Sequence, residues 1–361
     1  MHMKVTHGAL AAAVKSIAGA VPRENMSPWR HVRIDADGKH VTLTACDGDM
    51  QIERRINADV EEPGVVLVAG KQFVPFASAL PEGVCEICTH GMSRVKIVSG
   101  ASQFDVGAVG VEEWPVFSGP GEKSTAVYMP AITLREMIRK TAWSMSKDPT
   151  RSNLRCVHAE LVDGKLTMVA TDGRSLGMIE HELGVDGKAD VSFPEKLVGV
   201  LQSLLGSEGD ARLEFDRRAI RVTSADWSVT SRAIEDVYPL WRRVIPEKLL
   251  FSTVADRKLF LDETTRAALS SSEICGIGVA FTGKGIDFSA KCELSRYSSR
   301  IDVKSASEDA VRFMVDHRIL KAALGCLDAD EVTFCYAAAN APIVVKTEIP
   351  WLAVVMPLRE A

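Results

Sequence analysis

Aromatic residues, an excess of positive charge and long apolar runs are all scarce in this sequence. Only 6 % of the 361 residues are Phe, Trp or Tyr, and 43 basic side chains stand against 48 acidic ones, which gives a net charge of −5. Proteins that bind nucleic acid by neutralising phosphates usually carry a positive balance. The charge therefore excludes tight, phosphate-saturating binding, and any contact with nucleic acid must come from local placement of charge.

Membrane, secretory and cofactor signals are also missing. The N-terminus has no basic stretch that leads into an apolar core, so we expect no signal peptide. The apolar run 9–13 is too short to cross a bilayer. The eight cysteines are scattered rather than spaced as a disulfide framework. No phosphate-binding loop, dinucleotide fingerprint or nucleophile elbow occurs, and we expect a cytoplasmic protein with reduced thiols and no cofactor.

What the sequence does contain is a threefold internal repeat. Asp47 and Asp172 each follow an alternating apolar stretch and precede a glycine, and Cys292 stands at the matching place in a third copy. An apolar helix pattern and a short apolar strand follow each copy at similar spacing. The repeat is about 120 residues long, within the range of one small domain. It predicts three domains, over residues 1–122, 123–248 and 249–361.

Each repeat consists of two similar halves, in which one helix is followed by antiparallel strands. In the second repeat the apolar spacing predicts a helix over 132–145. Strands are expected over 156–161 and 165–170, joined at Asp163-Gly164, because Asp-Gly between alternating apolar stretches favours a hairpin. The predicted fold class is α+β, with helices on one face of antiparallel sheets. Such tandem units can close into a ring by head-to-tail pairing with a second chain, with the helices lining the hole.

Charge is distributed unevenly between the predicted helices and the rest of the chain. The six predicted helices carry +6, which leaves −11 elsewhere for a chain total of −5. They span residues 6–20, 70–80, 133–147, 194–206, 256–269 and 316–325. Helices tolerate Lys and Arg well, so chance placement is one interpretation. The other is a basic, helix-lined surface that holds a duplex by screened, sequence-independent attraction to phosphates.

Three motifs in fixed order add a family resemblance to the repeat. They are Thr171-Asp-Gly-Arg-Ser-Leu176, Tyr238-Pro-Leu-Trp-Arg-Arg-Val-Ile-Pro246 and Val354-Val-Met-Pro-Leu-Arg359. Together with the three repeats, they resemble the bacterial sliding clamp, the beta subunit of DNA polymerase III, over essentially the whole chain.

The resemblance implies a head-to-tail homodimeric ring without catalytic activity, which encircles duplex DNA and makes the polymerase processive. The implied partners are the DNA polymerase III alpha subunit, the clamp loader and other proteins with clamp-binding motifs, without a membrane. It also implies a pocket for partner peptides, formed by Leu154, Thr171, Gly173, Arg174, Leu176, Pro239, Arg243, Val244, Val354, Met356, Pro357 and Leu358. Aliphatic side chains and a flexible Met suit a site that accepts many short peptides. Plain core packing is the alternative interpretation of Leu154, Leu176 and Val244.

The resemblance also implies contacts with DNA and between protomers. The candidate phosphate contacts, each of which could equally be a solvated surface charge, are Arg23, Lys71, Lys147, Arg151 and Lys196. The edge strand over 103–108 is expected to pair with the third domain of a second copy, where Phe104 and Val106 would meet apolar residues near Leu269. The chain departs from the family pattern at Arg174 and Ser175, where His and Arg are common, so we expect somewhat different peptide preferences.

Two alternatives to a clamp remain at the level of the sequence. Asp47 or Asp172 could serve a metal-dependent phosphoesterase, but Asp is also favoured at turns for backbone hydrogen bonding, and Cys292 replaces it in the third copy. A tandem-repeat scaffold that associates with DNA without encircling it is the second alternative. The pair Cys85 and Cys88 lacks the second Cys pair of a structural zinc site, so we expect no metal there.

Overall fold

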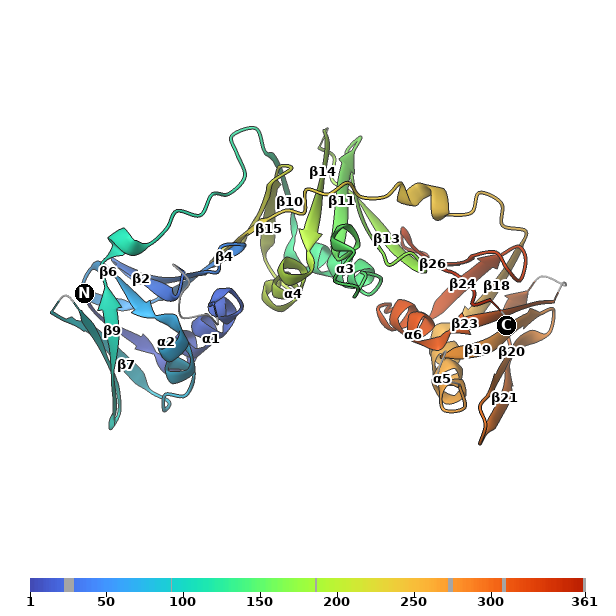
Figure 1. Ribbon diagram of the computed structural model, residues 1–361, viewed down its shortest axis with the longest axis horizontal. Coiled ribbons are helices and arrows are strands. Elements are labelled where there is room, and N and C mark those ends of the chain that lie inside the picture. Colours follow the sequence, from blue (N-terminus) through green and yellow to red (C-terminus); the bar gives the residue numbers. More distant parts are fainter. Residues whose placement is uncertain (23–28, 92, 186, 272–274, 307–309, 360–361) are drawn as a thin grey trace. The chain divides into compact units, whose positions relative to one another are not determined.

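Figure 1 shows the helices and strands of the computed structural model. The chain divides into two compact units. The first unit comprises Met1–Leu134 and Gly199–Ala233, and the second comprises Arg135–Val198 and Ile234–Ala361. The described residues are 1–22, 29–91, 93–185, 187–271, 275–306 and 310–359.

A single sheet of thirteen strands runs through the first unit, in the order β10-β15-β16-β17-β4-β3-β2-β6-β9-β8-β7-β1-β5. Its strands are β1 (His2–Thr6), β2 (His31–Asp37), β3 (His40–Cys46), β4 (Met50–Asn57), β5 (Asp59–Glu62), β6 (Gly64–Ala69), β7 (Val84–His90), β8 (Arg94–Ser99), β9 (Ser102–Val109), β10 (Thr125–Pro130), β15 (Asp210–Phe215), β16 (Ala219–Thr223) and β17 (Trp227–Arg232). All its strand pairs are antiparallel. The helices α1 (His7–Ile17) and α2 (Gly70–Ser78) pack against each other, and α1 also lies on β3 and β4.

The second unit contains two sheets, of nine and four strands. The larger has the order β14-β11-β12-β13-β26-β25-β24-β18-β22, and the smaller β21-β20-β19-β23. The strands are β11 (Cys156–Val162), β12 (Lys165–Thr171), β13 (Ser175–Glu182), β14 (Lys188–Pro194), β18 (Phe251–Asp256), β19 (Gly276–Thr282), β20 (Gly285–Lys291), β21 (Arg296–Ile301), β22 (Ser305–Ala306), β23 (Val311–Asp316), β24 (Glu331–Tyr336), β25 (Ile343–Lys346) and β26 (Trp351–Val355). The helices α5 (Arg257–Ala268) and α6 (His317–Gly325) pack against each other and over these sheets. The α+β prediction is confirmed.

Two further helices, α3 (Ala131–Ala142) and α4 (Glu195–Leu204), belong to the second repeat. In the part of the chain that the structure describes, the short 3-10 helices are η1 (Ala18–Ala20), η2 (Val111–Glu113), η3 (Ser152–Leu154) and η4 (Trp241–Val244). All six α-helices that the apolar spacing predicts are present in the described residues. The predicted hairpin between β11 and β12 is confirmed, because Asp163 and Gly164 have the positive φ angles, 50° and 76°, that a tight two-residue turn requires.

The ends of the helices differ from the predicted ones for local reasons. Asp256 and Asp316 lie just outside α5 and α6, because each carboxylate accepts a backbone N–H of the first turn and so acts as the N-cap. The helix predicted to reach Lys147 ends at Ala142. There the Ser144 hydroxyl donates to the carbonyls of Thr141 and Ala170, at 2.9 and 2.8 Å, which draws the chain out of the helical path. Lys147 therefore lies outside the helix whose charge it was expected to increase.

More than half of the few aromatic residues lie in the second unit, and five of them form a cluster in its core. The ring of Phe260 on α5 stacks on Phe334, with centroids 4.4 Å apart, and Phe281 stacks on Tyr336 at 4.6 Å. Phe313 meets Tyr336 edge-on at 5.7 Å. All five side chains are buried, and burial of each contributes about 1.5–3 kcal/mol. This cluster packs α5 against strands of both sheets of the unit.

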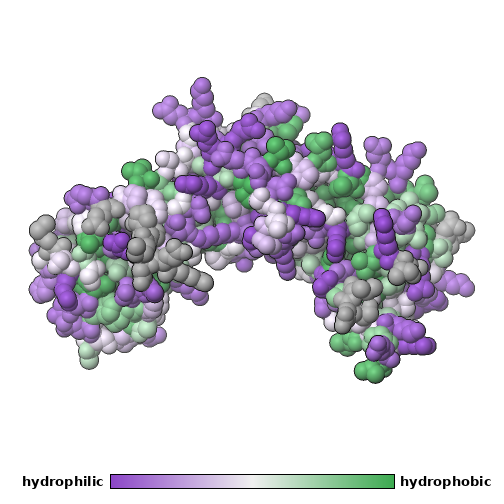
Figure 2. All heavy atoms as spheres, in the orientation of Figure 1, coloured by the Kyte–Doolittle hydropathy of each residue, from purple (hydrophilic) through white to green (hydrophobic). Residues whose placement is uncertain are grey.

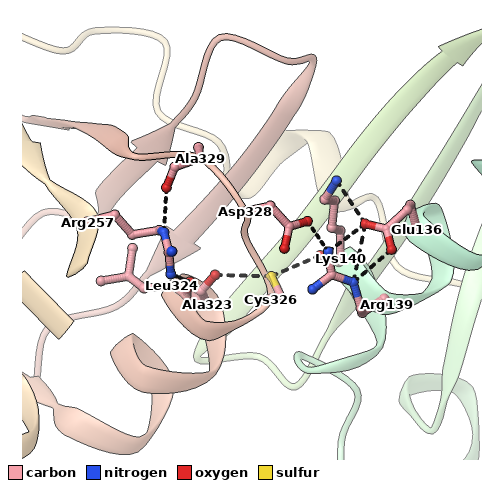
Figure 3. Close-up of polar contacts among 9 residues, drawn as sticks. All are labelled: Glu136, Arg139, Lys140, Arg257, Ala323, Leu324, Cys326, Asp328 and Ala329. Carbon is pink, nitrogen blue, oxygen red and sulfur yellow. Dashed lines mark hydrogen bonds and ion pairs between the residues drawn. The ribbon is translucent and has the colours of Figure 1, made fainter. Parts of the chain in front are cut away.

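Within the second unit, α3 is joined to the segment that follows α6 (Figure 3). The Arg139 guanidinium binds Glu136 on its own helix and Asp328 beyond α6. The carbonyl of Lys140 accepts the indole N–H groups of Trp143 and Trp351, at 2.9 and 3.0 Å. These contacts fix the end of α3 against β26, and so against the strand that leads into the C-terminal tail. No helix among the described residues is long and apolar enough to cross a membrane.

Candidate functional site

The turn between β12 and β13 is held by its own side chains. Asp172 Oδ1 accepts the backbone N–H groups of Arg174 and Ser175, at 2.8 and 2.7 Å. The Thr171 hydroxyl donates to the Ser175 carbonyl at 2.6 Å and accepts the Gly173 N–H at 3.1 Å. Gly173 has a φ of 86°, where an L side chain would be strained. The Asp172 carboxylate therefore shapes the turn, which agrees with the turn interpretation of the Thr-Asp-Gly motif rather than with a catalytic one.

The C-terminal strand places the tail beside this turn. β26 pairs with β13 so that Val354 lies opposite Leu176. Beyond the strand, the Met356 N–H donates to the Arg174 carbonyl at 2.9 Å, and the Leu358 N–H donates to the Met314 carbonyl at 2.7 Å. The turn and the tail, far apart in the sequence, therefore form one surface in the second unit.

Beneath this surface lies a compact apolar cluster. Its buried members are Cys156, Val169, Leu176, Tyr238, Trp241 and Val354, and Leu154 packs against it. Leu176 and Val354 are 1 % and 2 % exposed, so both side chains are packed within the cluster; this agrees with the core interpretation for Leu176, whereas Val244 is half exposed. Burial raises the pKa of the Cys156 thiol to about 12, which makes this cysteine an unreactive part of the floor.

Exposed apolar side chains surround this floor. Val244 is 50 % exposed, Leu240 67 % and Met356 38 %. Pro239, which precedes η4, and Arg243, which lies within it, are also exposed. We give the name tail surface to three parts taken together: the exposed residues around η4, the Asp172 turn (residues 171–175) and the C-terminal tail (residues 356–358). The exposed residues around η4 are Pro239, Leu240, Arg243 and Val244. All twelve residues predicted for the peptide pocket lie in the second unit, in the turn, the tail, the segment around η4 or the floor beneath them.

Sequence reasoning missed a polar network under the tail surface. Glu160 on β11 accepts the Trp241 indole N–H at 2.9 Å and binds Arg242 at 2.6 Å. The ring of His158 stacks on Tyr238, with centroids 4.4 Å apart and planes 3° apart. The alternation of β11 puts His158 and Glu160 on one face of the strand. That spacing was the available signal, but nothing in the sequence indicated which segment would cover this face.

The residues predicted to contact DNA are found in several places. Lys71 and Lys196 are exposed in the first turns of α2 and α4. Lys147 is exposed after α3, and Arg151 is exposed next to the Asp172 turn, where it donates to the Asp172 carbonyl at 3.3 Å. The location of Arg151 ties it to the tail surface. Arg23 lies outside the described residues.

The residues predicted for the dimer contact differ in exposure. β9 pairs with β8 along its length but with β6 only at Ala108 and Val109. Phe104 stacks on Phe76 with centroids 3.8 Å apart, whereas Val106 is 3 % exposed and belongs to the first unit's core. In the second unit, Leu269 is 83 % exposed and β21 is an edge strand. Figure 2 shows hydrophobic residues at the end of this unit where β21 lies.

Comparison with known proteins decides the family. The model of the DNA polymerase III beta subunit N-terminal domain matches residues 1–118, and that of the central domain matches residues 128–240. The chain belongs to the DNA polymerase III beta subunit family. Family membership supports the function of a processivity clamp in DNA replication, and an accessory rather than a catalytic role.

Relatives and solved structures agree with this assignment. The beta sliding clamp of Halalkalibacterium halodurans is 25 % identical and covers 96 % of both chains, and that of Pseudomonas aeruginosa is 25 % identical over 76 % of both. The Bacillus subtilis DNA polymerase sliding clamp structure has a TM-score of 0.93 at 20 % identity over the whole of both chains. The predicted sliding-clamp fold is thereby confirmed.

Proposed function

We propose that two copies of this chain form a closed, head-to-tail ring in the cytoplasm that encircles duplex DNA and holds DNA polymerase III on it. The bound partners would be the polymerase alpha subunit, the clamp loader and other proteins with clamp-binding motifs. Three domains with the predicted boundaries at 122 and 248 would give a ring of six similar arcs. Topological linkage needs no tight phosphate contacts, which agrees with a net charge of −5.

The observation that carries the partner-binding part is the tail surface. Exposed Leu240, Val244 and Met356 lie above a packed apolar floor. A short peptide with two or three apolar side chains would remove these residues from water, and each well-buried side chain contributes about 1.5–3 kcal/mol. The Thr171, Gly173 and Arg174 backbone and the Pro357 and Leu358 tail would frame such a peptide. The flexible Met356 would allow different sequences to fit.

For ring closure, we propose that the free side of β9 in one protomer pairs with β21 of a second copy. Phe104 would then approach the exposed Leu269, and β9 and β21 would each gain the hydrogen bonds that an edge strand lacks. Val106 would support this strand from within. Each such pairing joins different surfaces of the two chains, so two of them, related by the dimer axis, close a head-to-tail ring.

For DNA, we propose sequence-independent contacts by Lys71, Lys147, Arg151 and Lys196, with Arg23 as a further candidate. Each exposed cation would add one screened phosphate contact, so the contribution of each should fall as salt rises. No groove-reading element follows from these positions, and base-specific recognition is not part of the proposal.

The test is retention on closed DNA. The chain is loaded by its clamp loader onto nicked circular DNA, and the complex is separated from free protein by gel filtration. We expect stable retention that is lost when the circle is linearised, because an encircling ring slides off a free end. Equal retention on circular and linear DNA would contradict encirclement and favour a scaffold. As a control, Asp47→Asn with Asp172→Asn should leave retention unchanged, whereas a divalent-metal-dependent nuclease activity that these changes abolish would favour the phosphoesterase.

A further inference from the structure

We call the segment 234–250 the connector. It supplies buried residues of the apolar floor, such as Trp241, and exposed residues of the tail surface, such as Val244. η4 is its one regular element, and its first two residues both bind Glu160. The two carboxylate oxygens are used separately: Oε1 accepts the Trp241 indole N–H at 2.9 Å, and Oε2 binds the Arg242 guanidinium at 2.6 Å. The Arg242 guanidinium also lies over the Trp241 ring, 4.1 Å from its centroid.

Glu160 and His158 are well enclosed, whereas the Arg242 side chain is 58 % exposed. The Glu160 side chain is 17 % exposed and that of His158 is 7 % exposed. His158 Nε2 lies 3.4 Å from Glu160 Oε1, while Nδ1 is 2.9 Å from the Ser192 hydroxyl. Burial acts to raise the pKa of Glu160, but hydrogen bonds from His158, Trp241 and Arg242 outweigh it and lower the pKa to about 2. The carboxylate is therefore ionised at neutral pH, and its hydrogen bonds are of the stronger, charge-assisted kind.

The first unit has an acidic residue at the strand position that corresponds to Glu160, but, within the described residues, this residue does not bind a connector. β2 and β11 are corresponding strands of the repeat, and Asp35 occupies in β2 the place that Glu160 occupies in β11. Asp35 binds Arg33 of its own strand, at 2.5 Å. Arg33 stands where His158 stands in β11. An acidic residue at this position can thus be satisfied within its strand, whereas Glu160, besides its contact with His158, binds two residues of a different segment.

We propose that Glu160 is a positioning residue that holds η4 and the connector in the conformation that partner peptides bind. This inference rests on the proposed function of the tail surface. Trp241 fills the apolar floor and Arg242 binds the carboxylate, so the backbone of η4 is fixed from below. Its exposed residues Arg243 and Val244 then face solvent in one arrangement. A peptide that meets a preformed surface avoids the cost of ordering it.

The experiment uses the full chain and a fluorescein-labelled peptide that carries the clamp-binding motif of a DNA polymerase III alpha subunit. Glu160→Ala removes both acceptors, and we expect about tenfold weaker binding by fluorescence anisotropy. Glu160→Gln keeps an acceptor for the Trp241 N–H but loses the charge opposite Arg242, so we expect about threefold weaker binding, a partial rescue. Asp35→Asn is the matched control from the first unit and should bind as the unchanged chain does.

A local readout separates positioning from general loss of stability. Arg242, Arg243 and Lys248 are trypsin sites within the connector. We expect trypsin to cut there several-fold faster in Glu160→Ala than in Glu160→Gln or Asp35→Asn, under native conditions in which the rest of the chain stays intact. Faster cutting throughout the chain in Glu160→Ala, without preference for the connector, would mark a purely structural role and overturn the proposal.

The binding data also separate this inference from the proposed function. An unchanged chain that does not bind the peptide would contradict the proposed function, and with it the inference. An unchanged chain that binds the peptide, together with a Glu160→Ala variant that binds within twofold of it, would overturn the positioning role alone. In the Arg242→Met background, Glu160→Gln should add little further loss, because coupled residues do not act additively.

Discussion

The turn at Asp47 in the first unit and the turn at Asp172 in the second have the same backbone but different side chains. Asp47 Oδ1 accepts the N–H groups of Asp49 and Met50, at 3.0 and 2.9 Å, as Asp172 does in its turn. The Arg232 N–H donates to the Asp49 carbonyl at 2.9 Å, and the Met356 N–H donates to the Arg174 carbonyl at the same distance. The two copies of the repeat therefore share the individual hydrogen bonds of this turn.

The difference lies in the side chains that the two turns carry. Where the second unit pairs Leu176 with Val354, the first pairs Gln51 with Thr230. Met356 corresponds to Arg232, which is exposed and charged. In front of the first turn, Trp29 meets Trp114 and Phe117 edge-on, with centroids 5.6 and 6.2 Å apart. The same turn therefore supports an apolar, partly exposed surface in the second unit. In the first unit it supports a polar surface that aromatic side chains cover.

In the third copy of the repeat, the same turn forms without the Asp side chain. Cys292 replaces the Asp, and its thiol lies 3.1 Å from the Ser295 hydroxyl. The turn still closes, because the Cys292 N–H donates to the Ser295 carbonyl at 3.0 Å. In this turn Leu294 is 97 % exposed, and Glu293 beside it is exposed as well. The turn is therefore a scaffold whose function depends on what its neighbours present.

The largest expected effect comes from charging the tail surface. Met356→Asp places a carboxylate among Leu240, Val244 and the apolar floor, so we expect peptide affinity to fall by at least about a hundredfold. Arg232→Asp, at the corresponding place in the first unit, should leave affinity unchanged. Fluorescence anisotropy with the labelled clamp-binding peptide measures both. Equal losses in the two variants would show that the units are not distinct in this respect.

Exchanging the residue types at Leu176 and at the corresponding Gln51 should change the free energy of unfolding by different amounts. Leu176→Gln buries an amide among Cys156, Val169 and Val354 without a partner, and we expect the free energy of unfolding to fall by about 3 kcal/mol. The reciprocal Gln51→Leu should change it by less than about 0.5 kcal/mol, because Gln51 is only half-buried. Urea denaturation followed by tryptophan fluorescence provides the comparison, and a loss as large for Gln51→Leu would refute it.

A pH dependence should arise from Glu160. Its pKa is lowered to about 2 in the folded chain, below its value in the unfolded chain. Its contribution is therefore complete above about pH 4.5 and is lost as the pH falls toward 2. We expect the difference in unfolding free energy between the unchanged chain and Glu160→Gln to be about 1–3 kcal/mol at pH 6 and to shrink below pH 4. A difference that grows as the pH falls would contradict the network.

The smallest effects are expected at the two turn glycines. Gly48 and Gly173 have φ angles of 94° and 86°, so alanine at either costs about 1–2 kcal/mol of strain. The added Cβ would lie 3.2 Å from Trp29 Nε1 at Gly48 and 3.5 Å from Arg151 Nη1 at Gly173. Gly48→Ala should therefore lower the melting temperature slightly more, as calorimetry can measure. A variant of either glycine with no loss would show that its turn has relaxed to another conformation.

The sequence predicted the repeat, the class of fold and the helices because these depend on local periodicity. It placed the helix ends less well, because the Ser144 hydroxyl ends α3 through a hydrogen bond to the distant Ala170 carbonyl. The motifs led to the tail surface, but not to the division between buried Leu176 and exposed Val244. That division depends on which segment covers β11, as does the role of Glu160, and such long-range packing leaves no periodic signal in one sequence.

The number of peptides that one chain binds tests most directly whether only the second unit carries a partner surface. Isothermal titration of the unchanged chain with the clamp-binding peptide should give one peptide per chain of 39.2 kDa. Met356→Asp should abolish the heat of binding, and Arg232→Asp should leave both the stoichiometry and the affinity intact. Two peptides per chain, or loss of binding in Arg232→Asp, would contradict the claim that the second unit alone carries the partner surface.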